Sequence, residues 1–266
     1  MNFTVNGKDY HTEKTLTIAG LIKETKIDAD IFIVNSFPVS SSYIINNDDV
    51  ITLIKRGSPL QKEYLEYQLI SRQGLKEYTI LKNSSVVVCG LGGLGSNAAI
   101  SLARAGVGRL KLIDFDIVEP SNINRQAYFL EHTGMYKTDA LKDIISKINP
   151  YINIELSNIF LNKDNILNET SGFNVILECF DSAESKIMLI ENCVNNMAES
   201  YIISASGVAG YYDTELFKKK NIGNNCIVIG DFENESGINK GLYAPRVAAA
   251  ANIQANEALR YLLKDI

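Results

Sequence analysis

The stretch Val86-Val87-Val88-Cys89-Gly90-Leu91-Gly92-Gly93-Leu94-Gly95 decides how most of this chain folds. Its valine run predicts a strand that is buried on both faces. The glycines match the pattern G-x-G-x-x-G, which here ends a strand and opens a helix predicted over 96–105. In this context Gly90 permits a tight turn, Gly92 lets the backbone approach a phosphate, and Gly95 lets the helix pack on the sheet.

The start of this helix is suited to bind the phosphates of a nucleotide. A helix N-terminus offers unpaired N–H groups and about half a positive charge. We therefore expect phosphates to contact the glycine loop, which comprises Gly90, Gly92, Gly93, Leu94 and Gly95. The alternative is a glycine-rich turn that binds no ligand.

Beyond Ser84, strands and helices alternate. We predict strands at 86–88, 110–113, 152–156, 175–177 and 201–205, and helices at 96–105, 138–148 and 247–263. Alternation of this kind implies a doubly wound, Rossmann-like α/β fold with a mainly parallel sheet and helices on both faces.

Residues 1–57 predict a separate small β-grasp domain. Asn6-Gly7 favours a type I′ hairpin turn, Thr17 can cap a helix over 15–25, and apolar runs at 31–34 and 50–54 predict strands. Residues 58–83 are charged, with apolar positions spaced for one or two amphipathic helices. We interpret them as a connecting arm that joins the first domain to a third segment, 84–266.

The net charge of −5 and the pI near 5.2 argue against broad attraction to nucleic acid or to an anionic membrane. No apolar run approaches the roughly 20 residues that span a bilayer, and the N-terminus lacks the pattern of a signal peptide. We therefore expect a cytoplasmic protein with neither nucleic acid nor a membrane as its partner.

The four cysteines, Cys89, Cys179, Cys193 and Cys226, show no paired spacing. This predicts neither a disulfide framework nor a zinc ribbon. Cys89 and Cys179 each end an apolar run, where a cysteine usually acts as a small core residue.

Acidic and basic side chains follow the second predicted strand. An acidic residue here meets the ribose hydroxyls in this class of fold, and Asp114 is the better candidate, while Asp116 could equally cap a turn. Arg125 and Lys137 come next, and a dehydrogenase has no need of them beside the ribose. An enzyme that attacks the α-phosphate of ATP does need such cations, because negative charge builds there in the transition state.

These features resemble the ThiF/MoeB/HesA family, the prokaryotic relatives of ubiquitin-activating enzymes, and within it the short, zinc-less members of thiamine biosynthesis. The resemblance covers the chain after Ser58 and rests on three segments, which are Gly90 through Gln126, Glu178-Cys179-Phe180-Asp181, and Gly241 through Val247. It implies an enzyme that uses ATP and Mg²⁺ to adenylate the C-terminal glycine carboxylate of a ubiquitin-like sulfur carrier of the ThiS type. Pyrophosphate is released, and a sulfur donor acts later.

The resemblance also implies roles for individual residues. Asp114 would hold the ribose, and Asp181 would lie near Mg²⁺ and the α-phosphate. Asp181 alone could instead cap a helix predicted from Ser182 to Asn192. Arg72 would enter the ATP site of the neighbouring subunit of a homodimer, with a solvated helix arginine as the alternative. The residues implied around the phosphates are Asn122, Arg125, Gln126 and Lys137.

Two features depart from the family pattern. The CxxC pairs that bind zinc in larger relatives are missing, so we predict no zinc site, and we expect Cys226 to be a buried packing residue without a covalent role. The segment from Met1 to about Arg56 resembles the carrier itself but continues through Gly57-Ser58-Pro59 into the rest of the chain. Without a terminal carboxylate it cannot be adenylated, and we expect a role in dimerisation, docking or regulation.

Three rival functions stay open. An adenylyltransferase could serve a carrier of the molybdopterin or cysteine pathway. A nicotinamide-dependent oxidoreductase could use the same glycine loop. A non-catalytic scaffold could bind carrier or nucleotide, although the charges of Arg125, Lys137 and Asp181 exceed what binding alone requires.

Overall fold

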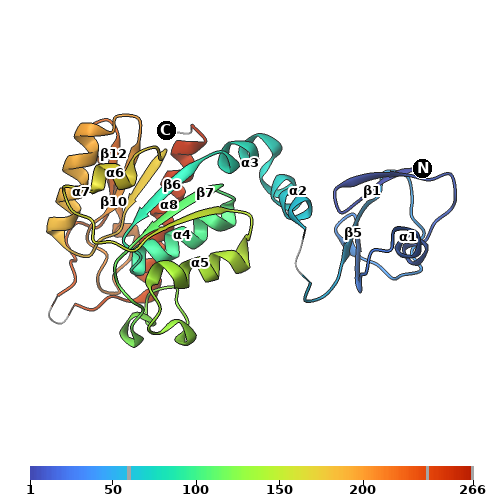
Figure 1. The fold of residues 1–266 in the computed structure, drawn as a ribbon, viewed down its shortest axis with the longest axis horizontal. Coiled ribbons are helices and arrows are strands. Elements are labelled where there is room, and N and C mark those ends of the chain that lie inside the picture. Colours follow the sequence, from blue (N-terminus) through green and yellow to red (C-terminus); the bar gives the residue numbers. More distant parts are fainter. Residues whose placement is uncertain (59–60, 238–239, 265–266) are drawn as a thin grey trace. The chain divides into compact units, whose positions relative to one another are not determined.

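The computed structural model describes residues 1–58, 61–237 and 240–264 and divides into two compact units, Met1–Leu75 and Lys76–Ile266 (Figure 1). Pro59, in the predicted connecting arm, and Ile266, at the end of the third predicted segment, lie outside the described residues. The boundary between the two units falls within the predicted arm. None of the helices in the described ranges is long and apolar enough to cross a membrane.

The first unit contains the predicted β-grasp fold, which is confirmed. Its five-stranded sheet has the order β2-β1-β5-β3-β4, with β1 and β5 parallel. Asn6 and Gly7 have positive φ angles of 49° and 78° in the hairpin between β1 and β2, and Thr17 accepts a hydrogen bond from the Gly20 amide as the predicted cap of α1. The elements of the sheet and its helix are β1 (Asn2–Val5), β2 (Lys8–His11), α1 (Ile18–Thr25), β3 (Ile31–Val34), β4 (Phe37–Pro38) and β5 (Val50–Ile54).

Two helices follow the sheet. The first, α2 (Lys62–Gln73), belongs to the first unit, and α3 (Leu75–Lys82) begins at the boundary. Gly74 separates them with a φ of 95°, a backbone conformation that favours glycine. The predicted arm is therefore helical on both sides of this glycine.

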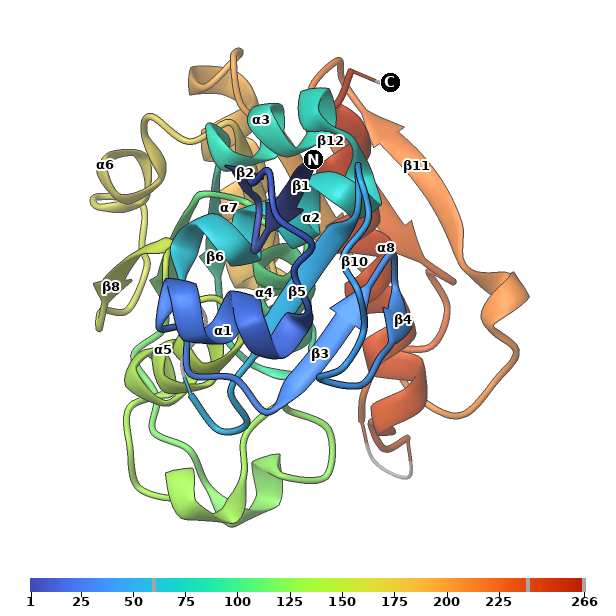
Figure 2. The ribbon, with the colours of Figure 1, turned by 90° about the vertical axis from the view of Figure 1, so that its right-hand side faces the viewer.

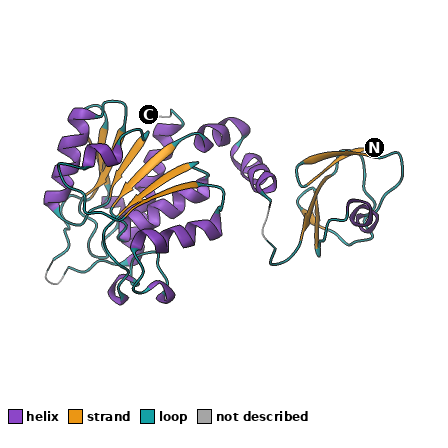
Figure 3. Cartoon of the chain, in the orientation of Figure 1, coloured by secondary structure: helices purple, strands orange, loops and turns teal. Residues whose placement is uncertain are grey.

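The second unit contains the predicted Rossmann-like sheet, which is confirmed. Its order is β11-β12-β10-β9-β6-β7-β8, and every pair is parallel except β11 with β12. Figures 2 and 3 show strands of this sheet with helices beside them. The strands are β6 (Ser85–Cys89), β7 (Arg109–Ile113), β8 (Asn153–Ser157), β9 (Val175–Glu178), β10 (Tyr201–Ala205), β11 (Lys218–Ile222) and β12 (Cys226–Gly230). The antiparallel edge strand β11 was not predicted, because its Lys-Lys-Lys sequence lacks an apolar alternation.

Helices cover both faces of this sheet. In β6, Val86 and Val88 pack toward α4, α5 and α8, while Val87 and Cys89 pack toward α6 and α7. The four cysteines are free and buried, which confirms the core role predicted for Cys89 and Cys179. The helices are α4 (Gly93–Ala105), α5 (Lys137–Ile148), α6 (Ile166–Thr170), α7 (Ala183–Asn196) and α8 (Ala244–Leu262).

Candidate active site

The glycine loop turns from β6 into α4 as predicted, and two of its glycines are required by packing. Gly90 has a φ of 90°, and a Cβ there would lie 2.9 Å from the Cys179 carbonyl oxygen. A Cβ on Gly95 would lie 1.9 Å from the Gly90 carbonyl oxygen. At Gly92, in contrast, the atom nearest to an added Cβ would be Nε2 of Gln126, at 3.9 Å. The backbone at Gly92 is therefore open to a ligand.

The first amides of α4 are placed where they could bind an anion. Gly92 is the N-cap and has no side chain to satisfy them, and the first backbone bond runs from the Ser96 amide to the Gly92 carbonyl over 3.0 Å. Within the described residues, the amides of Gly93, Leu94 and Gly95 have no hydrogen-bond acceptor. Free amides at a helix N-terminus bind phosphate oxygens.

The crowded Gly95 and the open Gly92 lead to contrasting predictions. Gly95→Ala should lower the free energy of unfolding by about 1–3 kcal/mol, because the new methyl group meets a fixed carbonyl. Gly92→Ala should fold normally but weaken nucleotide binding. Thermal denaturation and ATP titration of both purified variants measure these effects, and equal stability of the two variants would contradict the packing argument.

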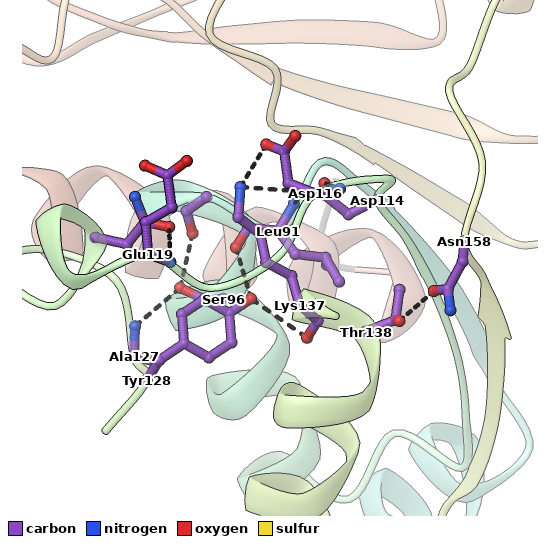
Figure 4. A network of polar contacts seen from close by, with 12 residues as sticks. Leu91, Ser96, Asp114, Asp116, Glu119, Ala127, Tyr128, Lys137, Thr138 and Asn158 are labelled. Atoms are coloured by element: carbon purple, nitrogen blue, oxygen red, sulfur yellow. Dashed lines mark hydrogen bonds and ion pairs between the residues drawn. The ribbon is translucent and has the colours of Figure 1, made fainter. Parts of the chain in front are cut away.

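Asp114 lies at the carboxyl end of β7 with only 8% of its surface exposed. One carboxylate oxygen accepts the Leu91 amide at 2.6 Å and the other accepts the Asp116 amide at 2.9 Å (Figure 4). Burial raises the pKa of this carboxyl, although Lys137 and the two amides oppose the shift. Asp114 thus ties the glycine loop to the end of β7.

Lys137 is the first residue of α5, and only 6% of it is exposed. Its Nζ lies 2.7 Å from an Asp116 carboxylate oxygen and 4.0 Å from one of Asp114 (Figure 4). The Tyr128 hydroxyl donates to the Leu91 carbonyl at 2.8 Å and so fastens this corner to the glycine loop. The structure therefore brings both aspartates and the lysine together beside the glycine loop.

The loop after Glu119 lies along the start of α4. Arg125 in this loop is half-buried as a residue, and its guanidinium donates to the Ser121 carbonyl at 3.1 Å. The Asn97 side chain donates to the Arg125 carbonyl at 3.2 Å, and the Ala127 amide donates to the Ser96 hydroxyl at 3.1 Å. These bonds hold the loop against the glycine turn.

The two amide side chains of this loop differ. Asn122 is buried and accepts the Glu119 amide at 3.1 Å, so its side chain caps the short 3₁₀ helix Pro120–Asn122. Gln126 is also buried, and its Oε1 has no partner among the described residues. Because such an atom is costly to leave unpaired, Gln126 is the better placed of the two to contact a ligand.

Arg125 lines a groove with a volume of about 690 Å³. It is lined by Asn124, Arg125, 236–237 and 240–245. Two of its side chains, Arg125 and Lys240, are cationic, which suits an anionic ligand.

Asp181 follows β9 and is exposed, with no hydrogen bond or ion pair in the described part of the chain. Ser182, not Asp181, caps α7 by accepting the Ser185 amide at 3.1 Å, so the capping alternative for Asp181 is wrong. The carboxylate of Asp181 is therefore free to meet a ligand.

The sequence analysis missed Glu178, which is fully buried three residues before Asp181. Its carboxylate accepts the Phe180 amide at 2.6 Å and the Lys186 ammonium at 3.0 Å, and it also accepts the Ser204 hydroxyl. Glu178 thus fixes the turn that presents Asp181. A lone glutamate at the end of an apolar run gave no signal of this role.

Two further predicted residues, Arg72 and Cys226, lie elsewhere. Arg72 is exposed in the last turn of α2, within the first unit. Cys226 is a buried core residue of β12, as expected, and burial raises its pKa to about 12. Across the described ranges, no three His, Cys, Asp or Glu side chains are grouped to hold a metal ion.

The fold is that of a Rossmann-like α/β protein with a glycine loop at the start of α4 and an N-terminal β-grasp unit. The chain belongs to the ThiF family, which residues 64–265 match, while residues 1–57 match the ThiS-like ubiquitin family. The predicted resemblance is therefore confirmed.

Two curated relatives similar to this chain are called adenylyltransferases. It is 36% identical over 176 residues to the Saccharomyces cerevisiae protein called adenylyltransferase and sulfurtransferase UBA4, a match that covers 63% of this chain and 39% of the relative. It is 32% identical over 184 residues to the molybdopterin-synthase adenylyltransferase of Salmonella typhimurium, covering 68% of this chain and 74% of the relative. The chain thus spans well under half of the yeast relative.

Among solved structures, the chain resembles E. coli tRNA N6-threonylcarbamoyladenosine dehydratase, TcdA, in complex with ATP. The TM-score is 0.70 at 21% sequence identity, covering 78% of this chain and 98% of that chain. E. coli MccB with ATP matches at a TM-score of 0.57 and 22% identity, covering 76% and 63%. At these identities the likeness establishes the fold.

Proposed function

We propose that this protein is an ATP-dependent adenylyltransferase that activates the C-terminal carboxylate of a ubiquitin-like sulfur carrier. One observation carries the proposal: the buried Lys137 ammonium lies 4.0 Å from the Asp114 carboxylate oxygen that accepts the Leu91 amide in the glycine turn. A preorganised cation next to a phosphate site suits chemistry at a phosphate, where negative charge grows in the transition state.

In this proposal the chain's residues mainly bind and orient. The amides of Gly93 to Gly95 hold phosphate oxygens, and Asp114 accepts the ribose hydroxyls with its remaining lone pairs. Lys137 and Arg125 place positive charge at the α-phosphate. A carboxylate oxygen of the carrier attacks the α-phosphorus, the bond to the bridging oxygen breaks, and pyrophosphate leaves. No covalent enzyme intermediate is needed.

The site also suits Mg²⁺, which would neutralise phosphate charge. Mg²⁺ is usually bound through one or two carboxylates together with substrate phosphates. Asp181 offers one exposed, unpaired carboxylate at the carboxyl edge of the sheet. The lack of a closed cluster of ligands in the described residues fits such an open, substrate-completed site.

Finer parts of the proposal follow from the family resemblance. We infer that the carrier is of the ThiS type, in thiazole synthesis for thiamine, in the cytoplasm. We infer further that a sulfur donor enzyme acts on the acyl-adenylate, and that a homodimer lets Arg72 reach the partner's ATP site. One of the two curated relatives is called a molybdopterin-synthase adenylyltransferase, so a carrier of the molybdopterin pathway is the alternative.

Carrier-dependent exchange of labelled pyrophosphate into ATP tests the proposal, using a panel of purified carriers. We expect exchange with a ThiS-type carrier and none without a carrier or with a carrier that lacks its terminal glycine. Tight NAD(H) binding without exchange would instead favour the oxidoreductase. Exchange only with a molybdopterin-type carrier would keep the activity and reassign the pathway.

An aromatic pair missed by the sequence analysis lies next to Asp114. The rings of Phe115 and Phe160 are half-exposed and meet edge to face with centroids 5.1 Å apart. Stacking of a base on an aromatic side chain contributes about 1–3 kcal/mol. We therefore expect Phe160→Ala to raise the KM for ATP roughly tenfold and to leave kcat nearly unchanged. Phe129→Ala, an equally exposed aromatic outside this pair, is the control; equal KM values for the two variants would refute an adenine subsite here.

A further inference from the structure

The β-grasp sheet of the first unit has two faces, and α1 covers only one. Phe3, Val5, Ile51 and Leu53 point to that face and form the core with α1. Side chains alternate along a strand, so Thr4 and Thr52 point to the opposite face. In a free β-grasp domain this second face would be open to solvent or to a partner.

Here the second face is covered by α2 of the same chain. Thr52, on the central strand β5, is only 8% exposed, and so is Tyr64 of α2. Burial raises the pKa of Tyr64, and a hydrogen bond with Thr52 opposes that shift. A Cβ on Gly7 would lie 3.3 Å from Cβ of Tyr67 in the next turn of α2. The Thr4 hydroxyl is likewise inaccessible to solvent.

The contact matters to the helix as much as to the sheet. With 12 residues, α2 is at the length where an isolated helix is marginal in water. Tyr64 is its one buried residue within the described ranges, and it is buried beside Thr52 of the sheet. The β-grasp sheet therefore supplies the packing that α2 needs.

We propose that α2 permanently occupies the second face of the sheet, and that the β-grasp unit serves as a rigid platform for α2, not as a carrier. Arg72 in the last turn of α2 is then held by the platform. The sheet face is closed to other proteins, so the carrier substrate is a separate chain.

A disulfide between positions 7 and 67 tests this directly. The distance of 3.3 Å between an ideal Cβ at Gly7 and the Tyr67 Cβ is close to the Cβ separation of natural disulfides. The four native cysteines are buried, so they compete little. In the full chain we expect the G7C/Y67C variant to oxidise nearly completely under native conditions. The carrier-dependent ATP–pyrophosphate exchange rate of this variant should agree within twofold between its oxidised and reduced forms. This readout rests on the proposed function.

The single variants G7C and Y67C, which cannot form this bridge, are the controls for strain at the turn. Hydrogen exchange of the unmodified protein gives a second measurement, in which the α2 amides should be protected together with those of β5. Failure to bridge with unprotected α2 amides would overturn the proposal. A tenfold loss of ATP–pyrophosphate exchange on oxidation, restored by reduction, would also overturn the proposal, because the second face of the sheet would then have to open during the reaction. If the unmodified protein shows no ATP–pyrophosphate exchange with any carrier, the proposed function fails. Disulfide formation and protection of the α2 amides then test by themselves whether the β-grasp unit is a platform for α2.

Discussion

Replacing Lys137 by methionine is expected to slow carrier-dependent ATP–pyrophosphate exchange by roughly 10²–10³ in kcat, the typical cost of deleting one preorganised electrostatic donor. Methionine keeps much of the aliphatic stem and removes the charge. The loss should be large because the ammonium is almost fully buried, where the field of a charge is poorly screened. Loss of the cation also leaves Asp114 without the charge that opposes the rise in its pKa.

A matched control lies on the same helix. Lys147 of α5 is 63% exposed and pairs with Asp143, so Lys147→Met should change kcat by less than twofold. Circular dichroism should show both variants folded. A Lys137→Met protein that retains full exchange would remove the role assigned to Lys137 at the α-phosphate.

Much of the second unit could be predicted from the sequence because its signals are local. The run from Val86 to Gly95 combines a buried strand, a turn that requires glycine and a helix start, and each residue acts on its immediate neighbours. The predicted strand 201–205 coincides with β10. Asp114 could be predicted because the order of elements in this fold puts the end of the second strand beside the glycine loop.

Contacts between distant segments could not be predicted in this way. Nothing in the sequence pairs Lys137 with Asp116, or brings Phe160 onto Phe115, because these pairs depend on where β7 and β8 end and where α5 begins in space. Glu178 looked like the polar end of an apolar run, and its partners Lys186 and Ser204 come from other elements. The cover of α2 over the β-grasp sheet is likewise a tertiary contact with no local signal.

The largest expected effect on stability comes from Asp231, which follows β12. Its carboxylate is buried and pairs with Arg246 of α8, whose side chain is only 2% exposed. That guanidinium also donates to the Asp213 carbonyl at 2.9 Å and lies 4.4 Å from the Phe217 ring centre. Removing one partner of a buried pair leaves the other charge uncompensated, at a cost of about 3–5 kcal/mol.

Asp231→Ala should therefore lower the Tm of the second unit by roughly 6–20 °C in thermal denaturation at neutral pH. Glu155→Ala is the control, because it breaks the half-exposed pair with Arg109 and should cost at most about 1 kcal/mol. Equal Tm values for the two variants would show that the buried pair adds no more than a surface pair.

The pH dependence of this difference gives a second test of its cause. Burial alone would raise the pKa of Asp231, but hydrogen bonds from Asn234, Glu233 and Arg246 outweigh it, and the pKa is lowered. A lowered pKa means that the carboxylate stabilises the fold at pH values above its pKa in the unfolded chain. This stabilisation is lost as the pH falls through the folded value. The gap in Tm between the unmodified protein and Asp231→Ala should therefore narrow in acid, and a gap that is constant with pH would assign the loss to the missing side-chain volume and not to the charge.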